Sequence, residues 1–216
     1  MKRHDVPHVV AQAAELAPQR LVLDVAALPD HAFGHKGLIW WGTIGFMVIE
    51  GSMFVMAIIT YFFLRTRVSD WPPSASNPDL TFGTLNTVIL LASIVPNQIA
   101  KRAAEKLDLR RVQFWLPICL AFGFAFLMVR AVEFTTLGVS WDSNAYGSIV
   151  WFLMGIHTIH LATDVLDTSV LTALVYTRHM DARRMVDVNE NAIYWDFVVL
   201  SWIPVYLVVY WAPRWL

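Results

Sequence analysis

The sequence is poor in charged residues and nearly free of cysteine. Only 15% of its 216 residues are Asp, Glu, Lys or Arg, and the formal net charge is −1. Soluble domains hold about a quarter charged residues, so this composition argues against a soluble protein. The small net charge gives no indication of a nucleic-acid partner. The single cysteine, Cys119, lies in an apolar block and excludes an intrachain disulfide.

Motifs that hold nucleotides or redox centres are missing as well. There is no glycine-rich nucleotide loop, no CxxC pair and no CxxCH haem-attachment motif. Inside the apolar blocks the only histidines are His157 and His160, and both fall in the same block. Two helices therefore cannot clamp a haem between them. We expect this chain to carry no redox centre of its own.

The sequence is rich in long apolar runs, and 57% of its residues are hydrophobic. Five apolar blocks approach or exceed the roughly 20 residues that a helix needs to cross a bilayer. These blocks are residues 39–64, 82–100, 114–137, 146–176 and 192–212. Strands are not expected, because the blocks are long and show no alternation. The sequence predicts an all-α protein, a polytopic membrane bundle of five transmembrane helices.

The chain divides into an N-terminal tail, residues 1–37, and a membrane domain, residues 38–216. The tail is charged and has no apolar run, so it is not a signal peptide. Five spans put the tail and the second and fourth connections on one side. That side holds twelve lysines and arginines, whereas the other holds Arg65, Arg67 and Arg214. The positive-inside rule therefore predicts a cytoplasmic N-terminus and a C-terminus on the opposite side.

The first block contains an isolated carboxyl group, Glu50, with apolar neighbours on both sides. A charged side chain at the bilayer centre costs at least about 2.5–3.5 kcal/mol on insertion scales. Glu50 is therefore expected to be protonated or bonded to a partner on another helix. One hypothesis makes it a proton-accepting or gating group, and the other makes it a buried acid that fixes helix packing.

The fourth block carries four ionisable residues at helical spacing. His157, His160, Asp164 and Asp167 are separated by three, four and three residues, which places them on one stripe of a helix. The stripe must face protein or water, with His160 and Asp164 spaced to form an i,i+4 hydrogen bond. A metal site and a proton path are both possible interpretations. We favour a polar seam that holds this helix against its neighbours and against Glu50.

Two further polar pairs occur in the second and third blocks. Arg130 and Glu133 are three residues apart, so they can pair on one face of a helix. We interpret them as a structural ion pair close to the membrane interface. Asn86 and Gln98 are interpreted as donors and acceptors of hydrogen bonds between helices.

Aromatic residues gather where the fifth block begins. Tyr194, Trp195 and Trp202 flank Asp196, which is another candidate for a buried acid. Trp41 stands near the start of the first block and belongs to a set of tryptophans near the ends of the spans. We expect these aromatic residues to pack at the level of the lipid headgroups, as in an aromatic belt.

Several segments resemble, in the same order, segments of cytochrome c oxidase subunit III. They are "WWGTIGFMVIEGSMFVMAIITYFFLR", "LNTVILLASI", "RAVEFTTLGVSWDSNAYGSIVWFLMGIHTIHL" and "YWDFVVLSWIPVYLVVYW". The resemblance extends from residue 38 to the C-terminus, and the five spans match the shorter bacterial form of the family. The positions that match the family motifs are Glu50, Glu133, Tyr146, Gly147, His157, His160 and Trp195.

The resemblance implies a non-catalytic, accessory subunit of a haem-copper terminal oxidase in the bacterial inner membrane, with its C-terminus in the periplasm. Haem and copper would lie in partner subunits, and this chain would pack beside subunit I with bound phospholipid. It would support proton uptake, stability and assembly of the subunit that reduces oxygen to water in aerobic respiration. The enzymatic activity, that of a proton-pumping cytochrome c oxidase, would belong to the whole complex.

Some positions depart from the family pattern. The last helix has Asp196 where the family has histidine, and Val199 where it has aspartate, so no mechanism based on that pair is expected here. Asp164 and Asp167 extend the polar stripe without matching a family motif. Two alternatives stay open: an accessory subunit of nitric-oxide reductase with the same fold, and a proton-coupled small-solute carrier. The odd span count and the absence of inverted repeats argue against the carrier.

Overall fold

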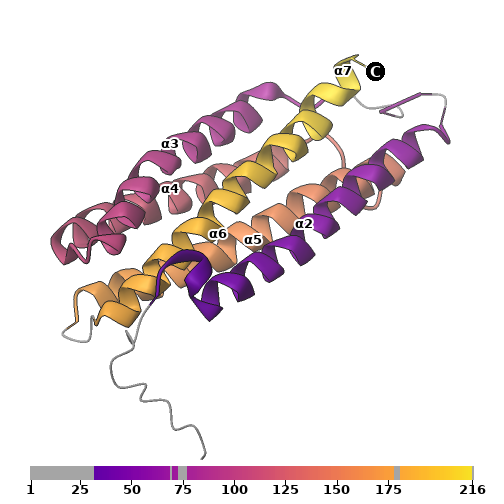
Figure 1. The fold of residues 1–216 in the computed structure, drawn as a ribbon. Coiled ribbons are helices and arrows are strands. Elements are labelled where there is room, and N and C mark those ends of the chain that lie inside the picture. Colours follow the sequence, from indigo (N-terminus) through magenta and orange to yellow (C-terminus); the bar gives the residue numbers. More distant parts are fainter. Residues whose placement is uncertain (1–31, 69, 73–76, 178–180, 216) are drawn as a thin grey trace, which may run out of the picture. The chain divides into compact units, whose positions relative to one another are not determined.

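The computed structural model describes residues 32–68, 70–72, 77–177 and 181–215. Five of its helices are long and apolar enough to cross a membrane (Figure 1). They are α2 (Leu38–Arg65), α3 (Leu80–Glu105), α4 (Leu109–Thr136), α5 (Ala145–Val175) and α6 (Ala182–Tyr206), the last continuing through the π-helical turn η2 (Leu207–Trp211) into α7 (Ala212–Trp215). The described residues contain no strand. The predicted all-α membrane fold with five spans is confirmed.

The predicted tail lies outside the described residues as far as residue 31. Its last part contains one short 3₁₀-helix, η1 (Gly34–Lys36), and α2 begins directly after Gly37. The start of the membrane domain at residue 38 thus coincides with the start of a helix.

The fifth span begins earlier than predicted. Helix α6 starts at Ala182, whereas the apolar block starts at residue 192, so residues expected to form a polar loop are helical. The reason is a buried stripe within the polar stretch: Met185 and Val188 are buried in a small core with Val112 and Leu171. The stripe is short and interrupted by charged residues, so average hydropathy does not reveal it.

Helix α6 holds the bundle together. It packs against α2, α3 and α5, while α4 packs against α3 and α5 (Figure 1). Among the long helices that the structure describes, α5 and α6 are the two against which α2 packs to more than a minor extent. Only 17% of an 18-residue apolar stretch of α2 is buried within the chain, against 50% of the corresponding stretches of α5 and the fifth span. Most of α2 therefore faces lipid or another protein.

Helix α5 begins with a close approach of two backbone segments at Gly147. A Cβ added there would collide with the backbone carbonyl oxygen of Ser140. We expect Gly147→Ala to destabilise the chain by about 1–3 kcal/mol, as overpacking does. The matched control is Gly155→Ala in the same helix, because no atom lies within 4 Å of a Cβ placed there. Thermal unfolding in detergent checks this, and equal midpoints for the two variants would contradict it.

The N-terminus of α3 is capped by an exposed carboxylate. The Asp79 side chain accepts hydrogen bonds from the Thr81 backbone N–H at 3.0 Å and from the Thr81 hydroxyl at 2.9 Å. These bonds favour the ionised form and lower the pKa of Asp79 below its ordinary value. The contribution of the ionised Asp79 cap to the stability of the folded chain is therefore complete at neutral pH. It is lost as the pH falls through the lowered pKa of Asp79.

Substitution of Asp79 should reveal this pH dependence. Asparagine caps helices without titrating, so wild type should lose stability relative to Asp79→Asn as the solution is acidified. Unfolding midpoints of both proteins from neutral to acidic pH measure the difference. Asp142→Asn, at an exposed position in a turn, is the control. A difference between wild type and Asp79→Asn that stays constant with pH would refute the prediction.

Candidate functional site

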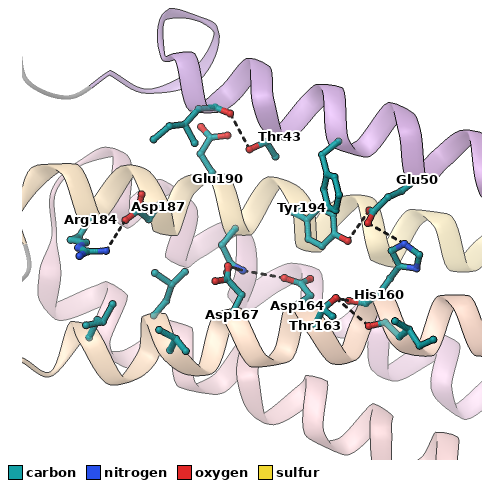
Figure 2. Close-up of a pocket in the computed structure, with 17 residues that line it drawn as sticks. Thr43, Glu50, His160, Thr163, Asp164, Asp167, Arg184, Asp187, Glu190 and Tyr194 are labelled. Carbon is teal, nitrogen blue, oxygen red and sulfur yellow. Dashed lines mark hydrogen bonds and ion pairs between the residues drawn. The ribbon is translucent and has the colours of Figure 1, made fainter.

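A cleft of about 640 Å³ opens between α2, α5 and α6 (Figure 2). We call it the acidic cleft, because carboxyl groups from all three helices line it. Its polar lining consists of Thr43, Glu50, His160, Thr163, Asp164, Asp167, Arg184, Asp187, Glu190, Asn191 and Tyr194. Its apolar lining consists of Ile39, Phe46, Ile159, Val170, Leu171 and Leu174.

Glu50 links all three helices of the acidic cleft. Its Oε1 lies 3.1 Å from Nε2 of His160 on α5, and its Oε2 accepts a hydrogen bond from the Tyr194 hydroxyl on α6 at 2.7 Å (Figure 2). Nδ1 of His160 bonds to the backbone carbonyl of Ile156 at 2.5 Å. The buried glutamate therefore has partners on both neighbouring helices, and the predicted contact between the polar stripe and Glu50 is made by His160.

The hydrogen bonds of His160 determine how protons are arranged in this cluster. The Ile156 carbonyl can only accept, so Nδ1 of His160 must carry a hydrogen. With that hydrogen on Nδ1, the contact between His160 Nε2 and Glu50 Oε1 can be bridged by one further hydrogen.

The two aspartates of the stripe share one asparagine. Nδ2 of Asn191 donates to Asp164 Oδ1 at 3.0 Å and to Asp167 Oδ2 at 3.2 Å, while Asn191 Oδ1 accepts from the Thr168 hydroxyl at 3.2 Å. The predicted hydrogen bond between His160 and Asp164 is wrong, because both ring nitrogens of His160 have other partners. In the part of the chain that the structure describes, no three His, Cys, Asp or Glu side chains are placed to hold a metal ion.

His157 lies apart from the acidic cleft. Its ring is fully buried, and Nε2 donates to the Val198 carbonyl at 3.0 Å. The rings of Phe54, Phe126 and Trp202 surround it. The predicted stripe of four is therefore divided: three of its residues line the cleft, and His157 belongs to the core.

A second polar cluster joins α3, α4 and the end of the fifth span. Arg130 Nη1 lies 3.2 Å from Glu133 Oε2, and both side chains are 1% exposed. Asn86 Nδ2 and the Tyr210 hydroxyl also donate to the Glu133 carboxylate. The Arg130 guanidinium lies 4.1 Å from the ring centroid of Trp202. The predicted pairing of Arg130 with Glu133 is present, and it lies in the interior of the bundle.

Asp196 faces α3 and not the acidic cleft. It accepts hydrogen bonds from Asn97 Nδ2 at 2.9 Å and from Gln98 Nε2. Asn86 and Gln98 thus both make the interhelical hydrogen bonds that we expected. Asp196 connects α6 with α3, so its environment differs from that of Glu50.

The candidate aromatic residues take three kinds of position. Trp195 and Trp202 lie in the core, where their indole nitrogens donate to hydroxyls of α3. Tyr146 is also buried, against the rings of Tyr61 and Trp71. Trp41 is exposed, as a belt residue would be. Tyr194 lines the acidic cleft.

Several residues of these clusters were not expected from the sequence, among them Asn191, Glu190 and Tyr210. Asn191 and Glu190 line the cleft, and Tyr210 bonds to Glu133. Asn191 stands three residues before Tyr194 on the same face of α6, a spacing that could have indicated it. It was missed because residues 182–191 were interpreted as a loop.

Comparison with known proteins supports the resemblance. The family model described as "Cytochrome c oxidase subunit III" matches residues 19–214. A cytochrome c oxidase subunit 3 from Thermostichus vulcanus is 29% identical over 188 residues, covering 86% of this chain and 92% of the relative. The subunit 3 from Synechocystis sp. is 28% identical, covering 84% of this chain and 80% of the relative. The subunit 3 from Corynebacterium diphtheriae is 27% identical, covering 90% of this chain and 93% of the relative. The chain therefore belongs to the cytochrome c oxidase subunit III family, as its motifs predict.

Proposed function

We propose that this chain is the accessory subunit III of a haem-copper terminal oxidase in a bacterial inner membrane. It packs beside subunit I, and the haem and copper centres lie in partner subunits. Its N-terminus is cytoplasmic and its C-terminus periplasmic, in line with the bias of lysine and arginine. Family membership supports this function over the nitric-oxide reductase accessory and the solute carrier.

The contact between Glu50 and His160 is the observation that best supports a role in proton uptake. The pair holds one transferable proton where three helices meet, and four further carboxyl groups line the same cleft. The cleft has more carboxyl groups than cationic groups, and an excess of one sign of charge raises the local concentration of counter-ions, here protons. In this proposal the carboxyl groups collect protons, and the Glu50–His160 pair holds one of them for the partner subunit.

The acidic cleft is also the proposed site of bound phospholipid. Its apolar residues lie beside the polar ones, so it offers a surface for an acyl chain and a surface for a headgroup. Helix α2, which forms one wall, is largely exposed, so a lipid can enter from the side. Bound lipid would fill space between α2 and the rest of the bundle and stabilise their packing.

Purification from native membranes in mild detergent tests the proposed function. We expect the chain to co-purify with a haem-copper spectrum and cyanide-sensitive oxygen uptake. Haem that turns over nitric oxide but not oxygen would replace the proposal with the reductase accessory. A colourless chain that purifies without partners and exchanges a solute across vesicles would replace it with the carrier.

A further inference from the structure

A second pocket, of about 270 Å³, lies at the turn between α3 and α4 (Figure 1). It shares no lining residue with the acidic cleft. Its lining consists of Ile99, Arg102 and Ala103 of α3, Lys106 and Asp108 of the turn, and Arg111 of α4. We call it the basic pocket, because three cationic side chains and only one carboxylate line it. Positive charge is therefore in excess here.

Within the described residues, two of the three cations of the basic pocket have no partner. Arg111 Nε lies 3.2 Å from the Asp108 carboxylate. The side chains of Arg102 and Lys106 are exposed, and neither has a hydrogen bond or an ion pair with another described residue. The first turn of α4 borders the pocket, and its backbone N–H groups add partial positive charge. A ligand in the pocket can therefore reach accessible cationic groups, and these groups select an anion.

An exposed stripe on α3 leads to the basic pocket. Leu91 and Val95 are exposed, and Ile99 is partly exposed. Arg102 and Lys106 continue the stripe, since steps of three or four residues keep all five side chains on one face of the helix and its C-cap. The apolar part rises about 12 Å along the helix. This length is close to the roughly 15 Å of hydrocarbon in one leaflet, so one acyl chain can lie along it.

The turn presents a further apolar side chain next to the basic pocket. Leu107, between two lining residues, has φ 55°, in the left-handed region that favours glycine. Its N–H donates to the carbonyl of Ala104, and the N–H of Asp108 donates to that of Ala103, the pattern with which such a residue ends a helix. The Leu107 side chain is 47% exposed. An exposed leucine where glycine would be less strained fits a turn that lies in the membrane interface.

We propose that the basic pocket binds the phosphate group of an anionic phospholipid, with an acyl chain of that lipid along the stripe on α3. Arg102 and Lys106 donate charge-assisted hydrogen bonds to the phosphate oxygens. A glycerol headgroup adds no cation, whereas a choline headgroup carries one that the excess positive charge repels. Free phosphate has the charge but no acyl chain for the stripe. Basic groups at the cytoplasmic surface attract anionic lipids, and the bias of lysine and arginine predicts that this turn lies on that side.

The test compares charge variants inside and outside the basic pocket. The chain is purified from native membranes with the partners it retains and is delipidated. It is then titrated with dioleoyl phosphatidylglycerol or dioleoyl phosphatidylcholine, and native mass spectrometry counts the bound lipids. Lipid bound elsewhere, including the acidic cleft, is common to all variants, so differences between variants report the basic pocket.

Arg102→Gln/Lys106→Gln should weaken the binding of phosphatidylglycerol about 25-fold, because each cation near a membrane surface contributes about fivefold. The binding of phosphatidylcholine should not change. Arg110→Gln is the matched control, since Arg110 is an exposed cation of the same connection that does not line the pocket. It should change the binding of phosphatidylglycerol by at most about twofold, because charges out of contact are screened. Inorganic phosphate should not displace the lipid.

Four other outcomes would overturn the proposal. Retention of phosphatidylglycerol by the double variant would show that the pocket does not hold it, and an equal loss in Arg110→Gln would assign the attraction to the whole basic surface. Displacement of the lipid by inorganic phosphate would assign the pocket to a soluble phosphate. A zero-length cross-link from Lys106 to a carboxyl group of another subunit, without retained lipid, would show that a protein carboxylate fills it. If the double variant does not assemble, Arg102→Gln and Lys106→Gln decide singly, each with an expected loss of about fivefold.

Discussion

Glu50→Gln should leave the oxidase assembled but shorten its working lifetime during turnover several-fold. The glutamine amide can still accept from the Tyr194 hydroxyl and donate to Nε2 of His160, so both links of the native residue survive. It cannot release a proton. If the Glu50–His160 pair holds a proton for the partner subunit, this substitution removes that property alone.

Glu50→Ala should add a structural defect to the functional one. It leaves the partly buried Tyr194 hydroxyl and Nε2 of the buried His160 without their partner, and the orphaned nitrogen of His160 costs about 1–3 kcal/mol. We expect this variant to lose subunit III during purification, whereas Glu50→Gln retains it. Neither variant should alter the haem spectrum under the proposed function, in which the redox centres lie in partner subunits.

Oxygen uptake by purified enzyme over successive turnovers measures the lifetime, and densitometry of the purified complex measures retention. Glu105→Gln is the control, since Glu105 is an exposed glutamate of α3 and lies outside the acidic cleft. An unchanged lifetime for Glu50→Gln would show that the proton of Glu50 is not needed, and that Glu50 serves only in helix packing. Equal retention of Glu50→Ala and wild type would remove its structural role.

Features that depend on residues close together in the sequence could be predicted from it. Hydropathy over a window identified the five spans, because burial in lipid selects long apolar runs whatever their tertiary contacts. The Arg130–Glu133 pair followed from its spacing alone, as one helix places both side chains on one face. The start of α6 was missed, since Met185 and Val188 are buried by tertiary contacts within a polar stretch.

The composition of the site depends on how helices are rotated against one another, which no local pattern encodes. The spacing of His157 and His160 places them on one face of a helix. In the structure α5 is oriented so that His160 contacts Glu50, whereas His157 lies in the core. Tyr194 was interpreted as an interfacial aromatic residue, and its hydroxyl instead binds Glu50. Asp164 likewise finds its partner, Asn191, on another helix and not in its own.

Arg130→Met should be the most destabilising of the proposed substitutions. Arg130 and Glu133 are both 1% exposed, and Glu133 would keep only the neutral donors Asn86 and Tyr210. Removing one partner of a buried ion pair costs about 3–5 kcal/mol, because the remaining charge has lost its compensation. Loss of the guanidinium contact with Trp202 adds to this cost.

The double variant Arg130→Met/Glu133→Gln separates the unpaired charge from lost packing. It removes both charges of the pair and leaves neither one uncompensated, so its stability should recover well above that of Arg130→Met alone. Unfolding of the subunit in mixed micelles by increasing SDS measures the differences. Arg111→Met is the control, because that side chain is 68% exposed and its ion pair with Asp108 is worth at most about 1 kcal/mol. If Arg130→Met costs no more than this control, the buried pair does not stabilise the bundle, and the contacts of α3 with Glu133 and Trp202 must suffice without it.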